Sequence, residues 1–462
     1  MRSLTLFSLL LTASLRADDW PQWMGPQRDG VYRESNIPKE LPETLKYRWK
    51  KPIGPGYSGP SVANGKVYVM DRVPGAPKLA DPNAKPMPDP KDKNKYIFPK
   101  ATVTERTLCL SAATGDQLWH RDNDAVYQMS YSEGPRAAPT VHAGKVYALG
   151  AMGLLECLNA DDGKLIWKSD FQKDFSAPIQ AWGWAAHPFI DGDRVICFVG
   201  GKGAAVVAFN KDTGKELWRT LDSGEVGYST PMLATFGGKP QLVVYLSDGI
   251  YGLDPTTGKK YWSVPFPAQG EPTRPSVPIP TPILVDGKIF ITSGYEGEML
   301  IEVASDGASA KIVHHGTNIN KPDQTDQEKN SGLHAIIGTP VAKDGLVYGV
   351  DFMGEFRCLD PKTGERKWTS LEHYAGKQAL FGCAFLTPHE DRCFMFVDTG
   401  DLYLGVLTPK GFEHTSKTHL IDAVQPSPRG RRKVVWTPPA FAGHAIFIRN
   451  QDQILCAELK GS

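Results

Sequence analysis

The chain has no surplus of charge of either sign, because 51 aspartate and glutamate residues balance its 52 lysine and arginine residues. Without an overall field it has no long-range attraction for nucleic acid or acidic lipid, so neither is expected as a partner. Cysteine is also scarce. None of the seven occurs in a CxxC, a CxxCH or an adjacent Cys-Cys arrangement, which argues against redox and haem chemistry. The histidines, His314-His315 included, lack metal-ligand spacing, and no metal site is predicted.

Long apolar runs are missing too, and the run from Leu4 to Leu11 is too short to span a bilayer. It follows a basic N-terminus and precedes small residues that end at Ala17, which is typical of a cleaved secretory signal. No Cys follows to accept a lipid. We expect a signal peptide at 1–17, an N-terminal extension at 18–42 and one domain at 43–462. The mature chain is expected to be soluble and periplasmic or secreted.

Glycine and proline are abundant, with 46 and 37 residues, which suits many short strands joined by tight turns. Five segments share a pattern with Gly four residues before Trp: LSAATGDQLW, LNADDGKLIW, FNKDTGKELW, LDPTTGKKYW and LDPKTGERKW. Their tryptophans are 48, 51, 44 and 106 residues apart, so the last gap contains one degenerate repeat. A period of this length with four short strands per unit predicts a β-propeller.

Eight units of this kind fit the chain, and the predicted fold class is an all-β, eight-bladed β-propeller with four-stranded blades. The units cover residues 59–120, 137–170, 186–220, 229–264, 280–316, 338–370, 382–420 and 437–460. The last unit lacks its fourth strand, while Leu45 to Trp49 places a Trp in the repeat slot just before the first unit. We expect this N-terminal strand to complete the last blade, because ring closure removes exposed strand edges.

The repeat tryptophans are interpreted as structural docking residues that wedge between neighbouring blades, while the preceding Gly allows a tight turn. They are Trp49, Trp119, Trp167, Trp218, Trp262 and Trp368. Lys311 and Thr415 are assigned to this slot in units five and seven.

Four cysteines take matching positions on the third strand of their units and are expected to be small buried core residues. They are Cys109, Cys157, Cys358 and Cys456. Cys383 and Cys393 flank a short hairpin, and whether they form a disulfide across it is left open.

The Trp segments resemble the pyrroloquinoline-quinone (PQQ)-type propeller repeat, whose docking motif reads Ala-x-Asp-x-x-x-Gly-x-x-x-Trp, over essentially the whole mature chain. Proteins with this repeat include quinoprotein dehydrogenases, the propeller lipoprotein of the outer-membrane β-barrel assembly machinery and many exported chains of unassigned role. The opening DWPQWMGPQRDG, from Asp19 to Gly30, is similar to the start of many exported propellers of this class. The resemblance implies the fold and leaves the function open.

The longest insertions fall in loops that a propeller presents on one face, around the mouth of its central channel. They run from Val73 to Thr104, Pro265 to Pro280, Gly316 to His334 and Ile421 to Trp436. Loops on a rigid scaffold often have functional roles, so this insertion-bearing face is the predicted binding face. A polar or aromatic residue also precedes each inner strand, and pseudosymmetry should bring these together. The candidate ligand-binding residues are Tyr57, Arg136, Trp182, Trp184, His187, Tyr228, Arg274, His334 and Trp436, with Phe381 equivalent in unit seven.

Aromatic rings beside arginines would suit a flat anion or an acidic peptide. A basic cluster in the last insertion could contribute: Arg429, Arg431, Arg432 and Lys433. The alternative is that the rings merely plug the funnel and the cluster is a solvated loop. Tyr57 and Tyr228 recur in Gly-Tyr-Ser-x-Pro segments, which favours a turn-forming role for these two.

Two functions are compatible with these observations. The favoured one is a non-catalytic binding or assembly scaffold, a monomer without cofactor that presents its insertion-bearing face to a protein, peptide or glycan. The alternative is a PQQ-dependent alcohol or sugar dehydrogenase, which needs a carboxylate base and usually calcium. Glu133, Glu225 and Glu271 lie in suitable loops, but the sequence does not single any of them out. The resemblance also implies a vicinal disulfide in many such alcohol dehydrogenases, and this chain has no adjacent Cys pair.

Overall fold

The computed structural model describes residues 19–75, 78–79, 81, 84–88, 96–267, 278–317, 331–427 and 432–459. Several predictions fall outside the described residues and stay predictions: the signal peptide at 1–17, Glu271, Arg274, Arg429 and Arg431. Helix is almost absent from the described ranges, where it is limited to α1 (Phe171–Asp174) and the 3-10 turn η1 (Glu372–Tyr374). No helix in this part of the chain is long and apolar enough to cross a membrane.

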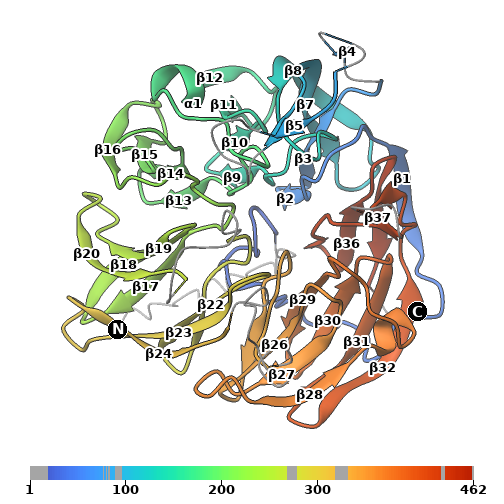
Figure 1. The fold of residues 1–462 in the computed structure, drawn as a ribbon. Coiled ribbons are helices and arrows are strands. Elements are labelled where there is room, and N and C mark those ends of the chain that lie inside the picture. The colour runs from blue at the N-terminus through green and yellow to red at the C-terminus, as the bar shows by residue number, and fades with distance from the viewer. Residues whose placement is uncertain are drawn as a thin grey trace, which may run out of the picture.

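Eight antiparallel sheets surround a central axis, which confirms the predicted eight-bladed propeller (Figure 1). Each blade runs from a short inner strand near the axis to an outer strand at the rim. Blades one and two consist of β2 (Ser61–Ala63), β3 (Lys66–Arg72), β7 (Ala101–Ser111), β8 (Gln117–Tyr127), then β9 (Thr140–His142), β10 (Lys145–Leu149), β11 (Leu154–Asn159), β12 (Leu165–Asp170). Blades three and four consist of β13 (Phe189–Asp191), β14 (Arg194–Phe198), β15 (Val206–Asn210), β16 (Glu216–Thr220), then β17 (Met232–Phe236), β18 (Lys239–Leu246), β19 (Gly249–Leu253), β20 (Lys260–Pro265).

The second half of the ring repeats this order. Blades five and six consist of β21 (Ile283–Val285), β22 (Lys288–Ser293), β23 (Gly297–Val303), β24 (Ala310–His315), then β25 (Val341–Lys343), β26 (Leu346–Val350), β27 (Phe356–Leu359), β28 (Arg366–Ser370). Blade seven consists of β29 (Ala384–His389), β30 (Arg392–Val397), β31 (Asp401–Thr408) and β32 (Gly411–His419), and blade eight of β35 (Ala440–Phe441), β36 (Ala445–Arg449), β37 (Gln453–Glu458) and β1 (Tyr47–Pro52). Short strands also occur in two insertions: β4 (Lys78–Leu79), β5 (Met87–Pro88), β6 (Tyr96–Ile97), β33 (Gln425–Pro426) and β34 (Lys433–Val434).

The ring closes by the predicted pairing of the two ends of the domain. Strand β1 pairs antiparallel with β37, and Trp49 lies opposite Cys456 in this register. The N-terminal strand is therefore the outer strand of blade eight, and the last blade has no unpaired outer edge on β37.

The repeat tryptophans pack between neighbouring blades, as the sequence predicts. In blade three, Trp218 Nε1 donates a hydrogen bond to the carbonyl of Pro255 in blade four at 3.2 Å. Its ring covers the turn residue Gly258, where a Cβ would lie 2.6 Å from a ring carbon. Trp49, Trp119 and Trp167 lie in the same way over glycines of the next blade and also donate to its backbone carbonyls. Glycine is needed at these turns both for space and for positive φ.

Each docking Trp has a small residue opposite it on the third strand. Cysteine takes this place at Cys109, Cys157, Cys358 and Cys456, and Ala208 and Gly252 take it elsewhere. A Cβ at Gly252 would lie 2.2 Å from the Trp262 ring, so a large residue would push the indole out of the seam. The four cysteines are buried, which confirms their predicted role as small core residues.

The predicted occupants of the Trp slot in blades five and seven are wrong. The register places His314 opposite Leu300 and Ser416 opposite Leu404, instead of Lys311 and Thr415. In the other blades the Trp slot lies four residues after the turn Gly. In these two hairpins the slot lies further along the chain, so the four-residue spacing points to a residue before it.

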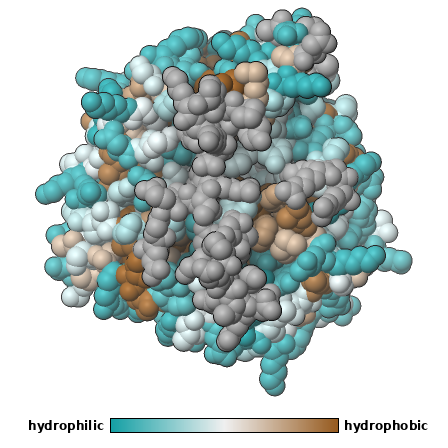
Figure 2. Space-filling model, in the orientation of Figure 1, coloured by the Kyte–Doolittle hydropathy of each residue, from teal (hydrophilic) through white to brown (hydrophobic). Residues whose placement is uncertain are grey.

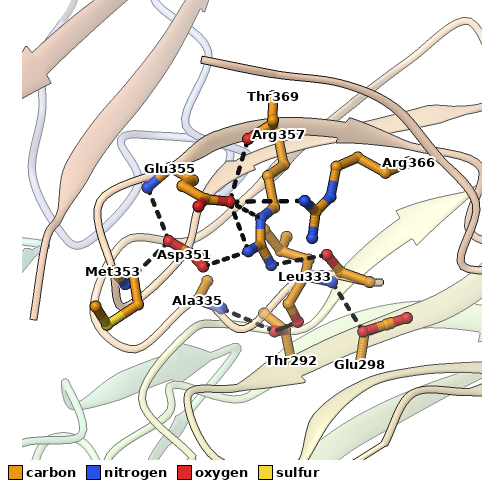
Figure 3. A network of polar contacts seen from close by, with 11 residues as sticks. Thr292, Glu298, Leu333, Ala335, Asp351, Met353, Glu355, Arg357, Arg366 and Thr369 are labelled. Atoms are coloured by element: carbon orange, nitrogen blue, oxygen red, sulfur yellow. Dashed lines mark hydrogen bonds and ion pairs between the residues drawn. The ribbon is translucent and has the colours of Figure 1, made fainter. Parts of the chain in front are cut away.

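The seam between blades five and six is polar where an indole would lie (Figure 3). His314 Nε2 lies 3.3 Å from Glu298 Oε1, and Glu298 Oε2 accepts from the Leu333 amide at 2.9 Å. On the blade-six side, Arg357 pairs with Asp351 at 2.7 Å and with Glu355 at 2.8 Å. Pairing of this kind offsets part of the cost of burying charges, and a buried ion pair is by itself weak evidence of added stability.

The two hairpin cysteines of blade seven do not face each other. Cys393 lies opposite Pro388, whereas Cys383 precedes β29 and its carbonyl accepts from Asp398 N. All seven cysteines are buried free thiols, so the disulfide that the sequence left open is not formed. The reason is register, because a cross-strand disulfide needs residues that are close partners in the ladder.

The N-terminal extension crosses the channel before it reaches the rim. Trp20 pairs with Val62 of inner strand β2, and the Pro21 carbonyl accepts from Val141 N of β9. The chain then passes blade seven, where Tyr32 N donates to the Pro388 carbonyl at 2.9 Å. Asp19 accepts from the Asn64 amide and Glu34 from the Gly443 amide, in the turns that follow inner strands β2 and β35, so the extension covers the channel on the face opposite the insertions.

The docking role of Trp218 predicts a stability effect that an exposed neighbour should not show. Trp218→Ala should lower the free energy of unfolding by about 3–5 kcal/mol, because packing between blades three and four is lost. Leu217→Ala is the matched control, since Leu217 is 44% exposed on the same strand and Trp218 only 8%. Urea unfolding followed by circular dichroism measures both. Equal losses for the two variants would contradict the docking assignment.

Candidate functional site

A pocket of about 210 Å³ lies in the central channel at the insertion-bearing face. Most of its wall comes from the loops that lead into the inner strands, the position that the pseudosymmetry of the ring predicts. The aromatic wall residues are Trp23, Tyr57, Tyr131, Trp182, His187, Tyr228, Tyr295, Phe381, Phe385 and Trp436. Hydrophilic residues dominate the described rim of the same face, so the apolar wall is set inside a polar surround (Figure 2).

Six of the nine candidate ligand-binding residues line this pocket together: Tyr57, Arg136, Trp182, His187, Tyr228 and Trp436. Phe381 joins them. Arg274 lies outside the described residues, and the other two, Trp184 and His334, are placed elsewhere by the fold.

Trp184 is a core residue and does not reach the channel. It is 2% exposed, its Nε1 donates to the Val199 carbonyl at 2.8 Å, and its ring packs edge-on against Phe171. The physical reason lies in Gly183, whose φ of 68° turns the chain sharply between Trp182 and Trp184. The two rings therefore point to different places, one into the channel and one between blades two and three.

His334 is buried in the seam between blades five and six. It is 1% exposed and lies against Gly297, where a Cβ would be 3.2 Å from its Cε1. Burial lowers the pKa of His334 to about 4, an effect that the nearby Glu298 only partly offsets. Its predicted place at the channel mouth is wrong, because the side chain turns sideways into the polar seam.

The pocket floor is a residue that sequence reasoning did not select. Trp23 comes from the N-terminal extension, and its Nε1 donates to Thr281 Oγ1 of blade five at 2.8 Å. Its ring stacks on His187 with 4.6 Å between centroids and 12° between planes. The Trp-Pro-Gln-Trp segment from Trp20 to Trp23 was the available signal, but only the closed channel gives it a partner.

His187 presents a defined hydrogen-bond donor. Its Nδ1 accepts from the Ala138 amide at 2.8 Å, so the neutral ring holds its proton on Nε2. Burial lowers the pKa of His187 to about 4, against a smaller opposing effect of the Ala138 contact. The imidazole is therefore neutral at physiological pH.

Two tyrosine hydroxyls of the wall, those of Tyr57 and Tyr228, form hydrogen bonds behind the ring and away from the pocket. The Tyr57 hydroxyl donates to Glu133 Oε2 at 2.7 Å and accepts from Gln425, and the Tyr228 hydroxyl donates to Glu225 and accepts from Trp182 N. Burial, followed by the adjacent carboxylates, raises the pKa of both hydroxyls well above the usual value. Both tyrosines thus stay neutral and present ring surface to the channel.

Trp436 is held by a buried ion pair. Its Nε1 donates to Asp398 Oδ2 at 3.3 Å, and Arg432 grips both oxygens of Asp398 at 2.7 Å. Arg432 therefore helps to hold the last insertion in place and is not a freely solvated side chain. Lys433 next to it is exposed. The Tyr374 hydroxyl completes the cluster by donating to Asp398 at 2.7 Å.

Two wall residues adopt backbone conformations that large side chains rarely take. Tyr131 has φ of 52° and Phe381 has φ of 58°. Bulky residues at positive φ store strain, and such residues cluster at binding sites where the surrounding structure dictates the side-chain direction. Here the strained backbone directs both aromatic rings into the channel wall.

Among the described residues that line the pocket, Arg136 is the one charged side chain. Its Nη1 donates to the Gly134 carbonyl at 2.8 Å, and its Nη2 donates to the Ser130 and Tyr131 carbonyls at 2.8 and 2.6 Å. The guanidinium also lies 5.3 Å from the centre of the Tyr57 ring. It is thus fixed by neutral groups, and within the described residues it has no ion pair.

The carboxylates beside the pocket are engaged by other groups. Glu133 and Glu225 accept from the two tyrosine hydroxyls, and Glu225 also accepts from the Ala181 amide at 3.3 Å. Within the described ranges, no three His, Cys, Asp or Glu side chains are grouped so that they could hold a metal ion. The described site therefore offers shape, aromatic surface and two donors.

The different surroundings of Trp182 and Trp184 predict different costs for the same substitution. Trp184→Ala should destabilise the fold by about 3–5 kcal/mol because it leaves a cavity in a closed core. Trp182→Ala should cost much less, since its ring borders the open pocket. Thermal and urea unfolding of both variants measure the difference, and a larger loss for Trp182→Ala would contradict the placement of the two rings.

The lowered pKa of His187 predicts a stability change with pH. In the unfolded chain this histidine takes up a proton near pH 6.5, whereas in the fold it does so near pH 4. Between these values the unfolded state binds more protons, so acidification favours unfolding. His187→Asn keeps an acceptor for Ala138 N but does not titrate. From pH 7 to pH 5, the wild type should lose about 1–2 kcal/mol more than this variant in urea unfolding. Parallel losses would contradict the assignment.

Comparison with known proteins places this geometry in a family. A family model described as outer membrane protein assembly factor BamB matches residues 104–370. BamB of Shewanella oneidensis is 24% identical over 241 residues, 51% of this chain and 56% of that protein, and BamB of Yersinia pestis is 24% identical over 240 residues, 50% and 55%. The chain thus matches little more than half the length of these relatives.

The solved structure of quinohemoprotein alcohol dehydrogenase from Comamonas testosteroni superimposes with a TM-score of 0.59 at 13% identity, over 96% of this chain and 81% of that one. This likeness concerns the fold alone. Because the family model covers more than half of the chain, this protein belongs to the family of PQQ-like-repeat propellers described as outer membrane protein assembly factor BamB.

Proposed function

We propose that this chain is an exported, non-catalytic binding scaffold that presents its insertion-bearing face to a protein partner in the periplasm. Its family includes proteins named for outer membrane protein assembly, and a role in the assembly of envelope proteins is the corresponding proposal here. The predicted signal at 1–17 supports export.

The observation on which the proposal rests is the pocket in the channel, whose aromatic rings are held in place before any ligand arrives. Trp23, Tyr57, Tyr228 and Trp436 each have their polar atom bonded to the wall behind them. Fixed aromatic surface binds with little loss of side-chain entropy, because the rings do not have to be ordered by the ligand. This arrangement favours recognition.

Catalysis of the quinoprotein kind has less support from the same residues. A PQQ-dependent dehydrogenase needs a free carboxylate base and calcium ligands beside the quinone. Glu133 and Glu225 are bound by tyrosine hydroxyls, and the seven cysteines are buried away from the pocket wall. The described residues therefore do not fit the quinone with its calcium ion, and no reaction step is derived through them.

Site-specific photo-crosslinking in the host tests the proposal. A benzoylphenylalanine in place of Tyr131 reports on the channel mouth, and one in place of Leu217 reports on the exposed rim of blade three. We expect a discrete crosslink to an envelope-assembly protein from position 131 only. The same pattern from both positions, or none from 131, would contradict a partner at the insertion-bearing face. Dye-linked alcohol oxidation with added PQQ and calcium would overturn the non-catalytic assignment.

A further inference from the structure

We propose that the channel pocket binds an apolar or aromatic group that bears a single carboxylate, with Arg136 as the residue that recognises the anion. This inference rests on the proposed function and deepens it, because it names the chemistry that the insertion-bearing face selects. The ligand chemistry is shared by the C-terminal residue of a peptide and by a small free acid.

The first argument is the apolar character of the wall, which is formed mainly by aromatic and aliphatic side chains. The hydroxyls of Tyr57 and Tyr228 and the indole nitrogens of Trp23 and Trp436 are all engaged away from the pocket. A sugar needs many polar partners, and a cation would be repelled by the charge of Arg136 in the same wall. With these four polar atoms engaged elsewhere, the wall instead favours an apolar group.

The second argument is the donor that remains. An arginine has five N–H groups, and Arg136 uses three of them on carbonyls. Nε–H and one Nη1–H have no partner among the described residues. Because the three carbonyl bonds and the Tyr57 ring fix the guanidinium, a carboxylate would meet a positive charge that needs no reorganisation.

His187 adds a second donor in the same wall. Its Nδ1 is used by the Ala138 amide, so Nε2 holds the proton, and the ring is clamped by Trp23. The wall therefore offers a fixed cation and a neutral N–H donor but no free carboxylate among the described residues. A carboxylate can accept hydrogen bonds from both donors. An amide in the same place would offer Arg136 only a neutral carbonyl oxygen, which forms a weaker hydrogen bond with the guanidinium.

The size of the pocket limits the ligand. An apolar cavity of about 150 Å³ is large enough to bind benzene. The 210 Å³ of this pocket accommodate one ring with a short acid arm, and Trp23, held by Thr281, forms part of its wall. A larger ligand would have to enter by its end, which is how the C-terminal residue of a peptide would bind.

Matched acid and amide probes test the proposal on the unaltered mature chain. N-acetyl-L-phenylalanine and its amide are titrated by isothermal calorimetry and by quenching of tryptophan fluorescence, since Trp23, Trp182 and Trp436 border the pocket. The acid should bind about tenfold or more tightly than the amide, the preference expected of a charged hydrogen bond. Equal affinity, or no binding of either, would overturn the proposal.

Three variants assign the preference to its residue. Arg136→Gln should reduce the acid-to-amide ratio to about one, while Arg219→Gln should leave it unchanged, because Arg219 pairs with Glu216 on the exposed rim. Trp182→Leu should weaken acid and amide alike, since it removes only ring surface. If Arg136→Gln fails to fold, the comparison of acid and amide on the unaltered chain still decides. A ratio retained in folded Arg136→Gln would contradict the assignment.

A second pair of probes distinguishes the two sources of the carboxylate, which are the C-terminus of a peptide and a small free acid. A Gly-Gly-Gly-Gly-Phe peptide and its C-terminal amide are compared with the single amino-acid acid. Tighter binding of the peptide acid supports a peptide end, and tighter binding of N-acetyl-L-phenylalanine supports a free acid. Failure of this inference is distinct from failure of the scaffold proposal, because crosslinks from position 131 would persist without any selectivity for carboxylates.

Discussion

The pairing of β1 with β37 is the contact on which the rest of the structure depends. Without it, blade eight would end at β37 with an open edge, and the ring would have no outer strand from which Trp49 could dock on blade one. All the loops that build the pocket face one channel only because the ring is closed. Buried Arg449 strengthens the same junction by donating to the Met70 and Gly54 carbonyls across blades eight and one.

Closure also decides the route of the N-terminal extension. Its C-terminal end is bound to the rim by β1, while Trp20 pairs with an inner strand, so the segment between them has to cross beneath blades seven and eight. Glu34 accepts from the Gly443 amide along this route at 2.8 Å. One segment thus completes the last blade and supplies the channel floor through Trp23.

The polar groups of the pocket wall explain why the site suits recognition. A buried hydroxyl or indole N–H needs a partner, and for Tyr57, Tyr228, Trp23 and Trp436 the partner lies behind the ring instead of in the channel. Glu133 and Glu225, the described carboxylates that could serve as bases, accept hydrogen bonds from the Tyr57 and Tyr228 hydroxyls. Arg136 is the exception, because neutral carbonyls satisfy only part of its donor set.

The Gly-x-x-x-Trp repeat was sufficient to predict the blade number, the closing strand and the docking role of the tryptophans, because these depend on local strand and turn chemistry. Pseudosymmetry also brought most of the candidate pocket residues to the right loops. It was wrong for Trp184, where positive φ at Gly183 turns the ring into the core, and for His334, which enters a seam without a docking Trp.

The sequence by itself determined the units of the ring, since each blade is specified by its own short-range pattern. Only the tertiary structure decided that Trp23 floors the pocket, that His314 takes a docking slot and that Arg432 is bound by Asp398. Trp23 and Thr281 are 258 positions apart, Arg432 and Asp398 come from different blades' loops 34 positions apart, and the place of His314 depends on hairpin length. Their partners are set by the closed geometry of the ring, and no local spacing encodes which side chains that geometry brings together.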